Sequence, residues 1–402
     1  MALHVRHPVW IFSAQPGAWT FTLLFFLESI ARASLATVMP LVAYETFGDK
    51  QTVSLAYTSV SVVALGLSFT IPIIIRHFSR RWTYSLGTVL LMCCAILLIM
   101  GLNSTMIIAM LLRTFGAALL NITLNLYIMD NIQKQQLVRS EPQRYAIATV
   151  AWTVAPLLGV WLYGSYGIMA AASLSVGGAM VLLVVFWLLR LNDKTPLRAA
   201  SRPGAVRPSN PLAAVPRFVS QPRLRLAWAI AFSRSSFWVT FFIYTPILMI
   251  EGGYSATVGG IIVAAGNLML FNNIFMERFA RRYGVRRILA LAQIIAAGFL
   301  VLTGAFVTLD AMISGVFLVT AAFFVSVMDG LGPVPFLRAV HTHERPQMTT
   351  VYRTYMDASE LIPPLIYAGL FVFAGFTGVF IALAATMAGI GLLTLRYLPR
   401  SL

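Results

Sequence analysis

The sequence predicts an all-α membrane protein with twelve transmembrane helices in two six-helix, pseudo-symmetric halves. Three observations lead to this fold class: an apolar composition, a series of long hydrophobic runs, and an uneven distribution of Lys and Arg. Hydrophobic residues make up 59% of the chain and charged residues only 10%, whereas a soluble domain carries about 25% charged residues. Because a soluble fold could not bury so much apolar surface, the chain is expected to cross a membrane many times.

Twelve runs are long and apolar enough, or nearly so, to cross a hydrocarbon layer, which needs about 20 helical residues. Six runs precede a polar, basic segment and six follow it. We therefore expect an N-terminal bundle (1–190), a basic, Pro-rich cytoplasmic linker (191–225) and a C-terminal bundle (226–402). The expected spans are 18–43, 53–75, 83–101, 105–129, 145–163, 168–190, 226–250, 255–275, 287–308, 311–336, 349–374 and 376–397.

Lys and Arg between the runs gather on one side of the expected membrane. On the other side the sequence offers a single base, Lys50. Because positively charged loops stay in the cytoplasm, we expect a multi-pass protein of an inner (plasma) membrane with both termini cytoplasmic. The net charge of +16 then faces anionic lipid, so we expect the lipid bilayer and no nucleic acid as partner, and a monomer.

Two short motifs recur at corresponding places in the two halves. RHFSRRW after the second run matches RRYGVRR after the eighth when Arg76 is aligned with Arg281. APLLGVWL in the fifth run matches PPLIYAGL in the eleventh. Parallel halves related by an axis along the membrane normal are a recurrent transporter design. Proline removes a helical hydrogen bond, so the second motif predicts helix bending at Pro156, Gly159, Pro363 and Pro364.

On these motifs the chain resembles the major facilitator superfamily. The signature of that family, G-x-x-x-D-R-x-G-R-R, has its last part in Ser79-Arg80-Arg81 here, and Arg76 stands where the family usually has Asp. The resemblance implies that this loop and its repeat gate the two halves. The loop residues concerned are Arg76, Arg80, Arg81, Arg281, Arg282 and Arg286.

Two further motifs make the chain most similar to twelve-span drug or metabolite:proton antiporters of that family. LLRTFGAALLN in the fourth run resembles the motif of an intramembrane Arg followed by small residues, and this implies a role for Arg113 in proton coupling. AWTVAPLLGV in the fifth run resembles the Gly-Pro motif of the antiporters. Several of these antiporters also carry an acidic residue midway along the first span, where this chain has Glu28.

A short set of charged residues remains inside the runs after the loop charges are set aside. Unpaired ions in a membrane interior are costly, and those present usually line a substrate or proton path. Four bases and four acids form the set: Arg32, Arg113, Arg234, Arg353, Glu28, Asp329, Asp357 and Glu360.

In the N-terminal half, the stretch FFLESIARASL places Glu28 and Arg32 one helical turn apart. At a rise of 1.5 Å per residue, Arg113 of the inward-running fourth span lies near the level of Arg32. We expect one carboxylate facing two guanidiniums. The alternative is a salt bridge that only fixes the packing of the first and fourth spans.

In the C-terminal half, Asp357 and Glu360 share a face of the eleventh run and either carry protons or pair with Arg234. Asp329 lies closer to the cytoplasm and is a candidate substrate ligand, a gate or a helix-end acid. Amides buried in a bundle either hold helices together or line a cavity. The candidates of this kind are Asn121, Asn125 and Asn267.

Other function classes lack support in the sequence. It contains no phosphate-binding loop, which argues against an ATP-driven pump, and no nucleophile–base constellation of an enzyme. The two histidines of His341–Glu344 lack further ligands for zinc. We expect no metal and no cofactor.

The expected function is secondary transport of a small organic solute by alternating access, with export in exchange for protons as the main hypothesis. A carboxylate beside an Arg can exchange its proton as the cavity opens to each side in turn. One alternative is uptake of an anionic nutrient, with Arg32, Arg113 and Arg234 as its ligands. Another is a membrane receptor or scaffold that keeps a transporter fold without moving a solute.

Overall fold

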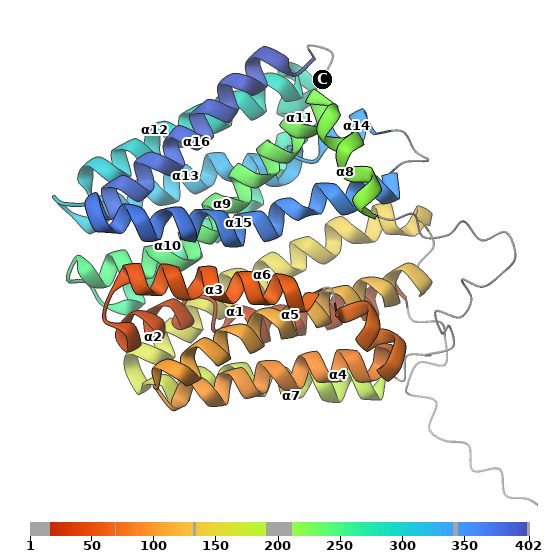
Figure 1. The fold of residues 1–402 in the computed structure, drawn as a ribbon, viewed down its shortest axis with the longest axis vertical. Helices are drawn as coiled ribbons and strands as arrows, with labels where there is room; N and C mark the ends of the chain where they lie inside the picture. The colour runs from red at the N-terminus through yellow and green to blue at the C-terminus, as the bar shows by residue number, and fades with distance from the viewer. Residues whose placement is uncertain (1–16, 69, 132–133, 190–210, 341–344, 400–402) are drawn as a thin grey trace, which may run out of the picture. The chain divides into compact units, whose positions relative to one another are not determined.

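The computed structural model describes residues 17–68, 70–131, 134–189, 211–340 and 345–399. All regular structure within these ranges is helical (Figure 1). The helices of the N-terminal half of the sequence are α1 (Ala18–Ala33), α2 (Val38–Phe47), α3 (Lys50–Ser68), α4 (Ile71–Ile99), α5 (Asn103–Asn131), α6 (Lys134–Tyr166) and α7 (Ile168–Leu188).

The C-terminal half begins with a short helix inside the segment expected to be a linker. The elements of this half are α8 (Pro211–Ser220), α9 (Pro222–Glu251), α10 (Ala256–Leu268), the 3₁₀ turn η2 (Met269–Asn272), α11 (Asn273–Tyr283), α12 (Val285–Phe306), α13 (Ala311–Leu331), α14 (Val334–Ala339), α15 (Arg345–Phe373) and α16 (Gly375–Tyr397).

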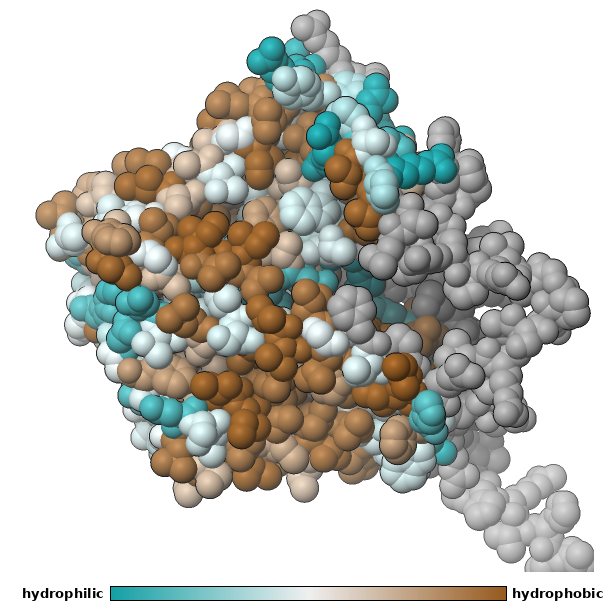
Figure 2. Space-filling model, viewed as in Figure 1, coloured by the Kyte–Doolittle hydropathy of each residue, from teal (hydrophilic) through white to brown (hydrophobic). Residues whose placement is uncertain are grey.

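The length and hydropathy of these helices confirm the predicted fold class. Within the described residues, 11 helical segments are long and apolar enough to cross a membrane, the first being α1 and α2 together. The expected eighth run forms the shorter apolar segment Ala256–Asn272, where α10 passes into η2. Large apolar side chains are exposed along the helices, and apolar residues cover much of the face in Figure 2, as a lipid-facing surface requires.

The chain divides into two compact units. Unit 1 contains residues 1–35 and 63–201, and unit 2 contains residues 36–62 and 202–402. Residues 36–62, which precede the basic segment, therefore pack with the C-terminal half of the sequence. The division falls within the turn Ser34–Thr37, which separates α1 from α2.

The core of unit 1 lies between α1, α4, α5 and α7. Tyr84 of α4 packs on Phe186 of α7 with their ring centroids 4.3 Å apart, and Tyr127 of α5 meets the same ring edge-on. Leu24 and Ala31 of α1 close this core from the other side. The core therefore combines aliphatic residues with two tyrosines.

Unit 2 has a comparable helical core, with α12 packed along α13 and α16 and α9 packed along α15 (Figure 1). Phe218 of α8 is buried with Leu224, Phe336 and Met348. This contact fixes α8 to unit 2, so the described end of the expected linker is an ordered helix.

The repeated loop motif has the same unusual backbone in both halves. Ser79 interrupts α4 with φ 63° and ψ 160°, and Gly284 separates α11 from α12 with φ 81° and ψ 141°. These residues occupy the same position when Arg76 is aligned with Arg281. Glycine adopts this conformation freely and serine does not, so the two halves share the turn although serine suits it less well than glycine.

Candidate functional site

Unit 1 holds a group of charged side chains on three helices. We call Glu28 and Arg32 of α1, Arg113 of α5 and Arg144 of α6 the unit 1 charge cluster. Glu28 and Arg32 are one turn apart on a single face of α1. Arg32 Nη1 donates to Glu28 Oε1 at 2.8 Å, so the structure brings together the pair that the sequence places on one helix face.

Glu28 is the most deeply buried member of this cluster. Its side chain is 0% exposed, whereas that of Arg32 is 23% exposed. Its second oxygen, Oε2, is buried and makes no hydrogen bond to any described residue. The carboxylate therefore uses one of its two oxygens, an uncommon state for a buried acid.

Arg113 of α5 lies against α1 and contacts its backbone. Its Nη2 donates to the carbonyl oxygen of Arg32 at 3.3 Å. Arg32 also lies 6.0 Å from the ring centroid of Trp152 on α6. The two arginines are thus neighbours at one level of the bundle.

Arg144 is a member of the cluster that the sequence reasoning missed. Its residue is 6% exposed, and its guanidinium lies 4.4 Å from the ring centroid of Phe25, one turn before Glu28. It also interacts electrostatically with Glu28. We counted Arg144 among cytoplasmic loop charges because it immediately precedes the fifth apolar run.

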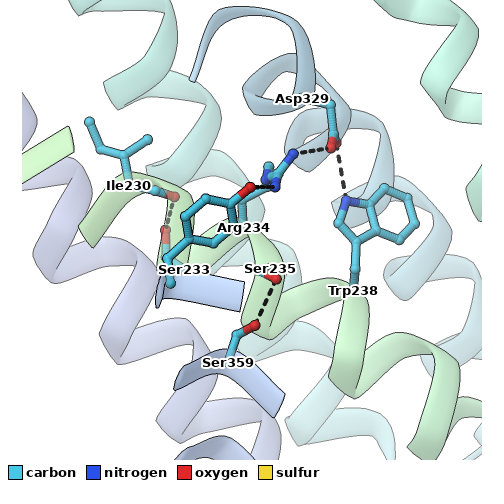
Figure 3. Close-up of polar contacts among 8 residues, drawn as sticks. Ile230, Ser233, Arg234, Ser235, Trp238, Asp329 and Ser359 are labelled. Atoms are coloured by element: carbon cyan, nitrogen blue, oxygen red, sulfur yellow. Dashed lines mark hydrogen bonds and ion pairs between the residues drawn. The ribbon is translucent and has the colours of Figure 1, made fainter. Parts of the chain in front are cut away.

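Unit 2 contains a second polar group, shown in Figure 3. We call Arg234 and Trp238 of α9, Asp329 of α13 and Tyr355 of α15 the unit 2 charge cluster. Arg234 Nη1 pairs with Asp329 Oδ1 at 2.6 Å, and Trp238 Nε1 donates to Asp329 Oδ2 at 3.1 Å. Arg234 Nη2 also donates to the Tyr355 hydroxyl at 3.1 Å. Both oxygens of this carboxylate are therefore bonded.

The partner of Arg234 is Asp329 rather than Asp357 or Glu360. Tyr355 already occupies the face of α15 that meets Arg234, and a residue two positions further along a helix points about 200° away. Asp357 and Glu360 are accordingly exposed. The carbonyl oxygen of Glu360 accepts a hydrogen bond from the Ser61 hydroxyl at 3.1 Å.

The amides expected to line a cavity differ in their surroundings. Asn125 Nδ2 donates to Asn121 Oδ1 at 2.8 Å, so these two are joined to each other along α5. Asn267 of α10 is 2% exposed. The amide pair of α5 is thus satisfied locally, and Asn267 lies inside unit 2.

The loop arginines contact their own units where their side chains are described. Arg81 stacks on Trp187 with 4.3 Å to the ring centroid, Arg282 lies 5.4 Å from the Tyr283 centroid, and Arg286 donates to the carbonyl of Leu395. Arg80 is half-buried. The side chains of Arg76 and Arg281, and the segment His341–Glu344, lie outside the described residues. A gating role for the loops stays a prediction.

The proline motifs are embedded in long helices. Pro363 and Pro364 are inside α15, which continues through them, and Pro156 is buried in α6. Gly159 has a clear packing reason, because a Cβ atom at this position would overlap the carbonyl oxygen of Ser34. The glycine thus lets α6 approach the end of α1 at the level of the charge cluster.

A polar contact joins α2 and α3 to α9 within unit 2. Lys50 Nζ pairs with Glu251 Oε2 at 2.6 Å, and the Tyr44 hydroxyl donates to Glu251 Oε1 at 3.1 Å. Further along α3, Ser54 Oγ and the Tyr244 hydroxyl share a hydrogen bond of 2.8 Å. These bonds hold residues 36–62 to the C-terminal half of the sequence.

Comparison with known proteins identifies the family. The family model described as Major Facilitator Superfamily matches residues 21–359. The chain belongs to the major facilitator superfamily. No curated protein matches the sequence.

Solved structures support the same fold. The peptide transporter POT in complex with sulfate has a TM-score of 0.73 at 15% identity, over 97% of this chain and 95% of that chain. A POT family transporter in complex with 5-aminolevulinic acid has a TM-score of 0.72 at 13% identity, over 96% and 98%. A mutant of the nucleoside transporter NupG has a TM-score of 0.70 at 13% identity, over 95% and 100%. At these identities the likeness concerns the fold.

Family membership confirms the predicted protein class. This major facilitator is a multi-pass membrane protein and a secondary transporter rather than an enzyme. The expected resemblance to the superfamily is therefore confirmed.

Proposed function

We propose that this major facilitator couples the movement of a small organic solute to protons by alternating access, with Glu28 as the proton-exchanging group. The observation that supports this role is the state of Glu28 itself. Its side chain is fully buried, one oxygen is paired with Arg32, and the other is without a hydrogen bond from the described residues.

A carboxylate in this setting responds to water. Burial disfavours its charged form, and the nearby guanidinium favours it. Arg32 is 23% exposed, so a modest opening of the bundle at Arg32 brings water to Glu28. Taking up a proton when buried and releasing it when wetted is the elementary step of proton coupling.

The break after α1 supports a moving site. Glu28 and Arg32 lie in the last two turns of α1, and the turn Ser34–Thr37 follows directly. Discontinuous helices commonly carry transporter binding sites. Because α1 belongs to unit 1 and α2 to unit 2, bending at this turn displaces the two parts of the first span.

The structural neighbours and the charge of the unit 1 cluster suggest which solutes to test. The neighbours carry the names of nucleoside and peptide transporters, so dipeptides and nucleosides are reasonable first solutes to test. Uptake of an anionic nutrient is the second candidate function. This candidate is favoured by the charge of the unit 1 charge cluster. Its described residues contribute three guanidiniums and one carboxylate. Export, the inner membrane, cytoplasmic termini and a monomer stay predictions.

Proteoliposomes containing a pH-sensitive dye test this proposal. Dipeptides, nucleosides and small carboxylic acids are added outside wild-type and Glu28→Gln protein. The matched control is Glu45→Gln, because Glu45 is an exposed glutamate of the same span. We expect solute-dependent proton movement in the wild type and in the control, and its loss in Glu28→Gln. Outward protons on external addition indicate exchange, and inward protons indicate co-transport.

Three outcomes contradict the proposal. Equal proton movement in Glu28→Gln and wild type removes Glu28 from the mechanism. Labelled-solute uptake that is insensitive to every imposed pH gradient removes proton coupling, and the absence of any uptake over the whole panel favours the scaffold.

A further inference from the structure

The face of α1 that carries Glu28 also builds the core of unit 1. Leu24 and Ala31 lie one turn before and one turn after Glu28 on the same face. Both pack in the cluster that contains Tyr84 and Tyr127. Glu28 therefore points into an aromatic core between α1, α4 and α5.

Tyr84 is an unusual member of that core. Its residue is 0% exposed, and its hydroxyl is buried without a hydrogen bond to any residue that the structure describes. The ring is held by Phe186 at a centroid distance of 4.3 Å. Phe would serve apolar packing equally well at this position. Because burying an unbonded hydroxyl is costly, the hydroxyl of Tyr84 needs another explanation.

The same core thus contains two buried oxygens without hydrogen bonds from the described part of the chain, Glu28 Oε2 and the Tyr84 hydroxyl. The two side chains are close enough to interact electrostatically, and Arg32 and Tyr127 belong to the same group. From α6, Arg144 also faces Glu28. From α7, the neighbours are the apolar ring of Phe186 and the hydroxyl of Ser175, which donates to the carbonyl of Ala31.

We propose that Tyr84 is a positioning residue of the proton site, and that its hydroxyl hydrogen-bonds to Glu28 Oε2 across one bridging water, or directly after a small movement of the two side chains. This inference rests on the proposed role of Glu28. A phenol can both donate and accept a hydrogen bond. It donates to the ionised carboxylate and, after a rotation of its O–H bond, accepts from the protonated acid.

This arrangement divides the carboxyl group between two helices. Arg32 holds Oε1 from α1, and Tyr84 serves Oε2 from α4. The proton then resides on the oxygen that faces the core, away from the guanidinium. A shift of α1 relative to α4 separates Glu28 from Tyr84 and so links the protonation state to the packing of unit 1.

The proton itself is the probe for the test, which therefore needs no identified solute. Infrared difference spectra of the full-length protein, recorded over a pH series, report the carbonyl stretch of protonated carboxyl groups. The band that disappears in Glu28→Gln is assigned to Glu28. We expect the midpoint of this band to move to higher pH by about one unit in Tyr84→Phe, because a hydrogen bond to a charged group is worth roughly that much.

Tyr244→Phe is the matched control. Tyr244 is also a fully buried tyrosine, but it lies in unit 2, and its hydroxyl is bonded to Ser54. We expect this variant to leave the Glu28 midpoint at the wild-type value. A midpoint in Tyr84→Phe that equals the wild-type midpoint overturns the inference and leaves the role of Glu28 intact.

A second readout uses the wild-type protein alone, so it does not depend on the folding of a variant. The Glu28 band should lie at the frequency of a hydrogen-bonded carboxylic acid, and the frequency of a free acid contradicts the inference. If no band disappears in Glu28→Gln, the carboxyl does not titrate, and the proposed function fails together with the inference.

Discussion

The charge clusters of the two units differ in how completely their carboxylates are bonded. In unit 2, Asp329 uses both oxygens, one with Arg234 and one with Trp238. In unit 1, Glu28 is more deeply buried than Asp329, yet only one of its oxygens is paired, with Arg32. A carboxylate with both oxygens bonded suits a fixed contact between helices, whereas a partly bonded one can exchange a proton or a partner at lower cost.

The presence of a buried charge pair does not by itself indicate its role. The number of hydrogen bonds that the carboxylate oxygens accept separates the two cases. The carboxylate of unit 2 follows the rule that buried polar atoms are satisfied. The carboxyl group of Glu28 departs from that rule, as the hydroxyl of Tyr84 does, and departures of this kind are expected at functional sites.

The largest effect is expected from a substitution that prevents α6 from packing closely against α1. Gly159→Ala puts a Cβ atom onto the carbonyl oxygen of Ser34, so α6 must move away and take Arg144 and Trp152 with it. We expect the free energy of unfolding to fall by about 3 kcal/mol, the upper range for overpacking, as measured by denaturation in detergent. Gly177→Ala in α7 is the control, because its Cβ meets nothing within 4 Å. Similar losses in the two variants would contradict the close approach.

Neutralising the two buried carboxylates, Asp329 and Glu28, should lower the stability by smaller and unequal amounts. Asp329→Asn leaves Arg234 partly buried without its counter-charge, and we expect a loss of about 2 kcal/mol, below the usual cost of a broken buried pair because both side chains are about one-fifth exposed. Glu28→Gln should cost less than about 1 kcal/mol, because the carboxyl that is proposed to take up a proton is neutral in that state, and Gln keeps its size and shape. Equal losses in the two variants, measured by denaturation at neutral pH, would abolish the distinction between the clusters.

The sequence identified the charged residues of the two clusters, except Arg144, but not how they are paired between helices. Hydropathy located the spans because the bilayer imposes a length on every helix. It also isolated Glu28, Arg234 and Asp329, since few charges remain inside apolar runs. Partner choice depends on how each helix is rotated, which no spacing within one helix reveals. Arg234 therefore meets Asp329, and the buried Arg144 looked like a loop residue because it precedes its run.

Substitutions in the repeated loops should change the stability of the protein by about 1 kcal/mol. Ser79 of unit 1 has the same left-handed backbone as Gly284 of unit 2. Ser79→Gly should stabilise the protein by about 1 kcal/mol, because serine is strained in a region that glycine adopts freely. Gly284→Ser should destabilise it by a similar amount. Changes of the same sign in both variants, read from thermal unfolding, would contradict the shared backbone.

A weaker contribution is expected from the ion pair that holds residues 36–62 within unit 2. Lys50 and Glu251 are each about one-quarter exposed, and pairs of this kind contribute about 0.5 kcal/mol. Lys50→Gln should lower the unfolding free energy by that amount at low salt, and the difference from wild type should shrink as salt is added. A salt-independent difference would point to the lost packing of Lys50 on Phe376 instead of its charge.

The smallest expected effect tests whether full bonding of carboxylates extends across unit 2. Asp49 precedes α3, where Oδ1 accepts from the backbone N–H of Gln51 at 2.7 Å and Oδ2 accepts from that of Thr52 at 3.0 Å. Burial acts to raise the pKa of Asp49, but the hydrogen bonds from Thr52 and Gln51, together with the charge of Lys50, outweigh it and lower the pKa below its ordinary value of 3.8. The stabilisation is therefore present above the unfolded pKa and disappears as the pH falls through the folded pKa.

Asp49→Asn isolates this effect, because Asn is as good an N-cap as Asp but does not titrate. We expect the acid limb of the stability curve, measured by denaturation between about pH 5 and pH 2, to be shallower in Asp49→Asn than in wild type, with only a small difference at neutral pH. Glu45→Gln, an exposed carboxylate on the preceding helix, is the control. If both variants flatten the curve equally, the effect follows from net charge, and the bonded state of Asp49 contributes nothing. A flattening confined to Asp49→Asn extends the contrast with Glu28, because a bonded carboxylate of unit 2 then resists the proton that the half-bonded one is proposed to accept.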